Sequence, residues 1–266
     1  MDGADGGGLR GAAACAWEFV VVNPLPLIRP DWPAPAKVHA CVTTRAGGMS
    51  PPPYDSLNLG AHVGDGEAEV AGNRARLRAV LPSEPVWLDQ VHGIAVAEAD
   101  TASGVPTADA AVARHAERVC AVLTADCLPV LFCDEAGTVV AAAHAGWRGL
   151  AAGVLEATVA RMGVPPASVL AWLGPAIGPH AFEVGGEVRA AFLADDPAAA
   201  AAFAPGRGRD KWMADLFALA RRRLARIGVL RVHGGGLCTH TDAARFYSYR
   251  RDGVTGRFAS MVWLGR

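Results

Sequence analysis

The sequence has no uncharged apolar run of about 18 residues, the length that a membrane-spanning helix needs. It also has no excess of charge of either sign, since 25 Lys and Arg face 26 Asp and Glu and leave a formal charge of −1. A chain with so little net charge offers no general attraction for nucleic acid or for an anionic membrane. We therefore expect a small molecule as the partner.

Cysteine is sparse as well, with six residues in 266 and no dense, regularly spaced framework of the kind that staples small secreted domains. A chain of this length can bury a substantial core without disulfides. The first ten residues carry acid before any apolar stretch, unlike a signal peptide. These features predict a cytoplasmic protein in a reducing compartment, with a flexible leader over residues 1–15.

No internal repeat and no linker interrupts the rest of the chain, so we expect residues 16–266 to form one domain. Apolar residues at helical spacing predict helices, and short β-branched runs bounded by Gly and Pro predict strands. The expected helices are 67–81, 147–162, 187–193, an alanine-rich surface segment at 197–204, and 211–227. The expected strands are 37–44, 86–91, 94–97, 110–113, 119–124, 130–133, 139–143, 169–173, 248–249 and 258–264. This mixture indicates an α+β class.

Three soft or borderline metal ligands each lie inside a short turn marked by glycine or proline. They are His92 in DQVHG, Cys127 in TADCLP and His144 in AHAGWRG. A closed structural zinc site takes four protein ligands, whereas a catalytic one takes three and leaves a position for water or substrate. His92 and His144 lie where expected strands end, and Cys127 lies in the turn between two expected strands, so all three could meet at one end of a sheet. The set predicts a catalytic Zn²⁺ centre.

A simpler interpretation is that these residues are structural. A cysteine beside an apolar run is commonly a small buried hydrophobe, and the separations match no local zinc motif such as Cys-x-x-Cys. However, Asp126 beside Cys127 and Arg148 shortly after His144 place ionisable groups in otherwise apolar segments. Charged residues are rarely buried without a partner or a function. This context favours a site over a core.

Longer motifs occur in order along the chain. They are TADCLP at 124–129, HAGWRG at 144–149, LGPAIG at 173–178 with FEVG at 182–185, and SYRRD at 248–252 with TGR at 255–257. In these strings the chain resembles the YfiH family from about residue 38 to residue 264. Members of that family have been named polyphenol oxidase (laccase domain), peptidoglycan editing factor and zinc-dependent purine nucleoside phosphorylase.

The resemblance implies sheets packed face to face with helices outside, and it places His92, Cys127 and His144 at the family's zinc ligands. It also implies phosphorolysis of adenosine, inosine, guanosine and methylthioadenosine, with hydrolytic deamination of adenosine as a second reaction. The expected partners are thus purine nucleosides and phosphate, bound by a chain that we expect to be monomeric.

Three further residues are candidates for catalysis. Arg148 falls in the first turn of an expected helix, where an anion is attracted, so it could share an anion with the helix end or instead pair with a carboxylate such as Asp126 or Glu183. Arg45, in a Gly-Gly loop, is a second anion-binding candidate or a solvated loop residue. Asp126 could move a proton beside the metal, or it could cap backbone N–H groups in its turn.

Two other functions compete with this one. In a cysteine hydrolase or amidase that edits peptidoglycan precursors, Cys127 would be the nucleophile and His144 the base. A thiolate held by zinc cannot readily also be the nucleophile, so the metal content of the protein distinguishes the zinc enzyme from the cysteine hydrolase. A copper polyphenol oxidase would need many histidines, largely in His-x-His pairs, and eight histidines without one such pair argue against it.

Overall fold

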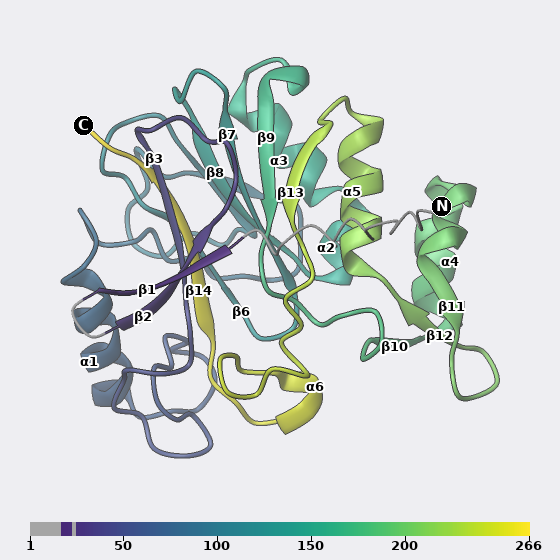
Figure 1. Ribbon diagram of the computed structural model, residues 1–266, viewed down its shortest axis with the longest axis horizontal. Helices are drawn as coiled ribbons and strands as arrows, with labels where there is room; N and C mark the ends of the chain where they lie inside the picture. Colours follow the sequence, from purple (N-terminus) through teal and green to yellow (C-terminus); the bar gives the residue numbers. More distant parts are fainter. Residues whose placement is uncertain (1–16, 23–24) are drawn as a thin grey trace, which may run out of the picture.

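A computed structural model describes residues 17–22 and 25–266, so the leader expected over residues 1–15 lies outside the described residues. Two large sheets form its centre (Figure 1). The first sheet is antiparallel throughout, in the order β1-β2-β3-β14-β6. Its strands are β1 (Trp17–Val22), β2 (Leu25–Pro30), β3 (Val38–Thr43), β14 (Phe258–Leu264) and β6 (Cys120–Thr124).

The second large sheet has six strands in the order β13-β9-β7-β8-β5-β4. It is mixed, because β13 runs parallel to β9 and β4 parallel to β5 while the other neighbours are antiparallel. Its strands are β13 (Arg231–Gly234), β9 (Val169–Leu173), β7 (Leu128–Asp134), β8 (Val140–Ala145), β5 (Ala110–Ala113) and β4 (Val96–Glu98).

The two large sheets pack face to face. On β7, Leu131 and Cys133 point into the core between the sheets, whereas Val130 and Phe132 point to the opposite face, as the two-residue period of a strand requires. Because β7 is buried on both faces, its sequence is an almost continuous apolar run.

Helices cover the outer faces of both sheets. α3 (Val154–Met162) and α5 (Leu216–Arg226) bury their apolar sides on the six-stranded sheet, and α1 (Glu67–Arg78) packs Leu77 on the five-stranded one. The expected α+β class, with face-to-face sheets and helices outside, is therefore confirmed.

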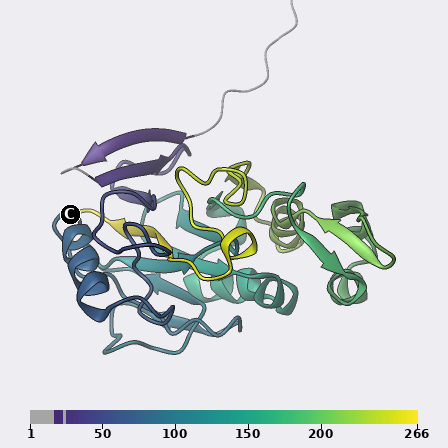
Figure 2. The same ribbon diagram turned by 90° about the horizontal axis from the view of Figure 1, so that it is seen from below.

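A third, small sheet stands apart from these layers. It has the order β10-β12-β11 and lies with α4 at one end of the molecule (Figure 2, green). Its elements are β10 (Glu183–Gly185), α4 (Gly186–Asp195), the 3₁₀ helix η2 (Pro197–Ala202), β11 (Phe203–Pro205) and β12 (Lys211–Ala214). Among the described residues, no helix has the length and apolar character to cross a bilayer.

Most expected elements are confirmed within about two residues, but several are not. The helix expected over 147–162 is interrupted at Gly153, whose φ of 104° is left-handed, and so divides into α2 (Trp147–Ala152) and α3. The strand expected over 86–91 makes only isolated bridges, at Val86 and Asp89.

Three other expected elements are wrong, because a helix-capping residue or a partner strand overrides the intrinsic helix or strand propensity of the segment. The stretch 211–227 begins as β12, and helix α5 starts only after the cap residue Asp215. The alanine-rich stretch 197–204 is a 3₁₀ turn that enters β11. Residues 248–249 are the start of α6 (Tyr249–Asp252), because the Ser248 hydroxyl accepts from the Arg251 N–H.

Candidate metal centre and adjoining cavity

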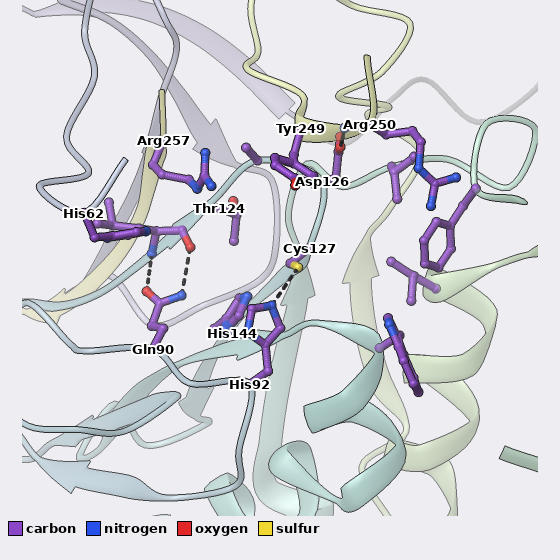
Figure 3. Close-up of a pocket in the computed structure, with 16 residues that line it drawn as sticks. His62, Gln90, His92, Thr124, Asp126, Cys127, His144, Tyr249, Arg250 and Arg257 are labelled. Carbon is purple, nitrogen blue, oxygen red and sulfur yellow. Dashed lines mark hydrogen bonds between the residues drawn. The ribbon is translucent and has the colours of Figure 1, made fainter. Parts of the chain in front are cut away.

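The three candidate ligands converge at one end of the sheet sandwich. Cys127 directly precedes β7, His144 lies on β8, and His92 lies in the loop before β4 with a left-handed φ of 61°. Their ligand atoms all lie within 4.8 Å of one another, and His92 Nε2 is 3.7 Å from Cys127 Sγ (Figure 3). The structure thus brings together, from three separate segments, the set that the sequence singled out.

A buried carboxylate orients two of these segments. Asp109 Oδ1 lies 2.8 Å from His144 Nδ1, which leaves Nε2 of that ring to face the other ligands. The same carboxylate accepts the backbone N–H groups of His92 at 2.9 Å and Gly93 at 2.6 Å. Burial alone would raise the pKa of Asp109, but these hydrogen bonds lower it below its ordinary value.

The absence of a side chain at Gly146 makes room for the group. A Cβ at this position would lie 2.6 Å from His92 Cδ2 and 3.1 Å from Cys127 Sγ. Real Cβ atoms essentially never come as close as 2.6 Å, so a side chain at 146 would force the His92 ring to shift. Glycine at 146 therefore allows the close approach between the start of α2 and the ligands.

Cys127 and His144 stabilise each other's charged forms. Burial raises the pKa of the Cys127 thiol, but the His144 charge and hydrogen bonds from both histidines outweigh burial and lower it to about 6. Burial lowers the pKa of His144, but the Cys127 thiolate and Asp109 outweigh it and raise it to about 9. A thiolate at neutral pH is the form in which cysteine binds metal or attacks an electrophile.

A cavity of ≈ 310 Å³ opens directly onto these ligands. One part of its wall is apolar and comes from Trp147, Ile177, Phe182 and Leu216. The other part is polar, and its residues lie to the left of Cys127 in Figure 3. Its members are His62, Gln90, Thr124 and Arg257. Such a mixed pocket suits a ligand with one flat apolar end and one polar end.

Asp126, expected as a proton carrier, lines this cavity and has a left-handed φ of 96°. Its Oδ1 accepts from the Thr239 hydroxyl and its Oδ2 from the Arg250 backbone N–H, each at 2.6 Å. The carboxylate thus joins the turn before β7 to the start of α6, and its catalytic role stays a prediction.

Neither of the two expected anion-binding arginines is among the described residues that line the cavity. Arg148 is exposed and its guanidinium lies 4.6 Å from the centre of the Trp147 ring. Arg45 pairs with Asp55 at 3.2 Å and lies over Tyr247. The pairing of Arg148 with Asp126 or Glu183 is not found in the described part of the chain, and the catalytic role of both arginines stays a prediction.

Sequence reasoning missed four polar residues of the site: Asp109, Gln90, Arg257 and His62. Asp109 carries the same signal that drew attention to Asp126, an acid within an apolar segment. The Gln90 amide donates to the Leu123 carbonyl at 2.9 Å and accepts the Leu123 N–H at 2.7 Å, which ties the His92 loop to β6. Arg257 lies in the motif TGR at 255–257, which was noted without a role for the arginine, and His62 lies in a polar loop, where nothing in the local sequence distinguishes it from a solvated residue.

Comparison with known proteins agrees with this architecture. Residues 39–265 match the family described as multi-copper polyphenol oxidoreductase laccase. A purine nucleoside phosphorylase of Pseudomonas aeruginosa is 62% identical over 237 residues, which are 89% of this chain and 98% of that protein. The purine nucleoside phosphorylase YfiH of Escherichia coli is 59% identical over 244 residues, covering 90% and 98% of the two chains.

The same likeness holds among solved structures. A Neisseria meningitidis protein, NMB0706, has a TM-score of 0.86 at 53% identity and covers 90% of this chain and 99% of its own. Fold and site together define a layered α+β protein with a His-Cys-His group that could hold a metal at the end of its sandwich. The chain belongs to the YfiH family, as its motifs predicted.

Proposed function

We propose that the protein is a zinc-dependent purine nucleoside phosphorylase with a second, adenosine deaminase activity. One observation carries this proposal: His92, Cys127 and His144 place their ligand atoms within 4.8 Å at the wall of a cavity that has an apolar and a polar side. The names of the relatives from P. aeruginosa and E. coli support the phosphorylase activity. The substrates would be adenosine, inosine, guanosine and methylthioadenosine, together with phosphate.

The residues present fit zinc. Two imidazoles and a thiolate are its preferred donors, and the thiolate form of Cys127 is already favoured by the neighbouring histidines. Asp109 fixes His144 through Nδ1, as carboxylates do for metal-binding histidines. Zinc held by three protein ligands would supply a Lewis acid with one open coordination position.

In phosphorolysis, a phosphate oxygen forms a bond to C1′ of the ribose while the bond from C1′ to the purine nitrogen breaks. The purine leaves with the electron pair and takes up a proton. We assign the apolar wall of Trp147, Ile177, Phe182 and Leu216 to the base, because a flat ring gains most from contact with such side chains. Asp126, at the same cavity, is the proposed carrier of the proton.

In deamination, water adds to the purine carbon that bears the amino group, and ammonia leaves. Both reactions would use one centre, because the described residues contain one group of this kind.

A test of the proposed function begins with elemental analysis of the purified protein. Adenosine should then give adenine and ribose 1-phosphate only when phosphate is present, and some inosine with or without it.

Replacing Cys127 by Ala should lower zinc content and both activities together, because a ligand is lost. If Cys127→Ala abolished one reaction and left the other at its original rate with zinc still bound, the single-centre mechanism would be wrong.

A second function is favoured by one specific observation. Asp109, His144 and Cys127 lie in the order of an orienting acid, a base and a nucleophile, as in cysteine hydrolases. Such an enzyme could act as an amidase on cell-wall precursors. Stoichiometric zinc in the purified active protein would exclude this function, because it occupies the thiolate. Amidase activity of the metal-free protein, blocked by alkylation of Cys127, would support it.

A multi-copper oxidase, which the family description mentions, needs several coppers and many histidines. Within the described residues, a single group of three candidate ligands is found, and one of the three is a cysteine. We therefore do not propose this activity.

A further inference from the structure

The polar side of the cavity holds a cation without an acid partner. Arg257 is half-buried and lines the cavity, and its Nη1 donates to the Thr255 and Gly256 carbonyls at 2.9 and 3.0 Å. Its Nε and Nη2 make no hydrogen bond with any described residue, and no described carboxylate pairs with it. A half-buried guanidinium with free donors usually has an anion to bind.

Burial lowers the pKa of Arg257, and the charges of Cys127 and then of Asp126 oppose that shift. Neither group makes a hydrogen bond or an ion pair with the guanidinium, and the Cys127 thiolate is a candidate metal ligand. Asp126 faces Arg257 across the cavity, but its two oxygens already accept from Thr239 and from the Arg250 N–H. A second basic side chain, His62, lines the same side. Burial, and then the charge of Arg257, lower the pKa of His62, so the two side chains are close enough to repel each other when both are charged.

A buried hydroxyl completes this side. Thr124 is 1% exposed and lines the cavity, yet its Oγ1 has no hydrogen-bond partner among the described residues. An unpaired buried hydroxyl costs free energy in the folded protein, and a ligand oxygen would remove that cost. Arg257, His62 and Thr124 therefore present donors to one place, beside Cys127 (Figure 3).

We propose that Arg257, His62 and Thr124 form the subsite for inorganic phosphate. This inference rests on the proposed phosphorylase function and moves the anion-binding role from Arg45 and Arg148 to residues that line the cavity. It also separates the two substrates: phosphate lies on the polar side, the purine lies against Trp147 and Phe182, and the ribose between them approaches the metal group.

The test compares phosphate binding among variants by isothermal titration calorimetry, at equal zinc content because zinc itself can bind phosphate. Arg257→Gln keeps the side-chain stem that packs on Gly60 but removes the charge. It should weaken binding by about 30-fold, as expected for a lost charged hydrogen bond. Arg257→Lys keeps the charge and should fall between Arg257→Gln and the wild type. It also shows the effect of charge if Arg257→Gln folds poorly.

Thr124→Val removes the hydroxyl at nearly constant shape and should weaken binding by about fivefold. Its matched control is Ser260→Ala, because Ser260 also has a buried, unpaired hydroxyl but does not line the cavity. Arg76→Gln, on the exposed side of α1, controls for net charge. Both controls should bind phosphate like the wild type.

In steady-state assays, Arg257→Gln should raise KM for phosphate and leave KM for the nucleoside nearly unchanged. Wild-type phosphate affinity in Arg257→Gln would overturn the proposal, and so would binding of adenosine 5′-monophosphate without binding of inorganic phosphate. If the wild type cleaved no nucleoside but its phosphate affinity still depended on Arg257, the subsite would stand and the proposed function would fail. If phosphorolysis occurred and Arg257→Gln left phosphate KM unchanged, the function would stand and the subsite would fail.

Discussion

At the scale of single residues, the Asp109 carboxylate contacts two of the three candidate ligands, the His144 ring and the His92 backbone N–H. Asp109→Asn keeps the shape but replaces one acceptor oxygen with an NH₂ group. In one orientation of the amide the Gly93 N–H loses its acceptor, and in the other the NH₂ group faces His144 Nδ1 and disfavours the present tautomer. We expect zinc affinity to fall by about 10- to 100-fold. We also expect the free energy of unfolding to fall by about 1–3 kcal/mol. A competition titration with a zinc chelator, together with urea unfolding, measures both effects.

Asp134→Asn is the matched control for this change. Asp134 is also a buried carboxylate that accepts backbone N–H groups, from Thr138 at 2.6 Å and Val139 at 3.0 Å, but it lies at the far end of β7. Its substitution should lower stability and leave zinc affinity unchanged. Equal loss of zinc affinity in both variants would show that Asp109 acts only through stability.

The charge of Cys127 predicts a pH dependence. In the metal-free protein the thiol pKa is about 6, so the reactive thiolate persists at neutral pH and is lost as pH falls through 6. Iodoacetamide labelling followed by peptide mass spectrometry should show a half-maximal rate near pH 6. Bound zinc should protect Cys127. Cys41, whose pKa burial raises to about 12, should stay unlabelled. A midpoint near the ordinary value of about 8.5 would contradict the predicted charge pair.

The sequence singled out His92, Cys127 and His144, because each is a zinc-type donor in a short segment marked by glycine or proline, although His144 lies on β8 and not in a turn. It was insufficient for Arg257 and His62, because their role depends on loops that meet only after both sheets have packed. Closeness in sequence does not by itself place a side chain in the cavity. Arg148 follows His144 by four residues, yet its side chain is exposed and lies over the Trp147 ring.

At the scale of elements, caps set the boundaries more firmly than propensity does. The stretch 211–227 has helical spacing, yet residues 211–214 pair with β10 and β11, and α5 begins where the Asp215 carboxylate accepts the Ala218 N–H at 3.0 Å. Periodicity cannot show this pairing, because the partner strands lie on another segment. The expected strand at 248–249 failed for a similar reason, since the Ser248 hydroxyl starts α6.

Asp215→Ala should lower the free energy of unfolding by about 1 kcal/mol, because the first turn of α5 loses its side-chain acceptor. Asp215→Asn retains an acceptor oxygen and should recover most of the loss. Urea unfolding followed by circular dichroism gives both values. Equal stability of Asp215→Ala and the wild type would mean that packing alone fixes the start of α5.

At the scale of the whole molecule, the site depends on both large sheets. β7 and β8 of the six-stranded sheet carry or adjoin Cys127 and His144, whereas β6 of the five-stranded sheet holds Thr124 and fixes Gln90 through Leu123. The core between the sheets therefore sets the distance between the metal group and the polar wall of the cavity. The α+β class was predictable from the mixture of elements. The position of the two sheets relative to each other was not predictable, because it arises from contacts between segments far apart in the chain.

Zinc should accordingly stabilise the whole fold, since its three ligands come from segments that the unfolded chain does not hold together. Binding to the native state alone adds about 4 kcal/mol when free zinc is a thousandfold above its dissociation constant. Removal of the metal with a chelator should lower Tm by several degrees, and zinc should restore it. Cys127→Ala should show a much smaller response to chelator, because it has lost a ligand. The contrary outcome is a constant wild-type Tm although elemental analysis confirms that the metal has left. In that case the protein alone would hold His92, Cys127 and His144 in place. The arrangement of Asp109, His144 and Cys127 as a cysteine hydrolase would then be the better account of the site.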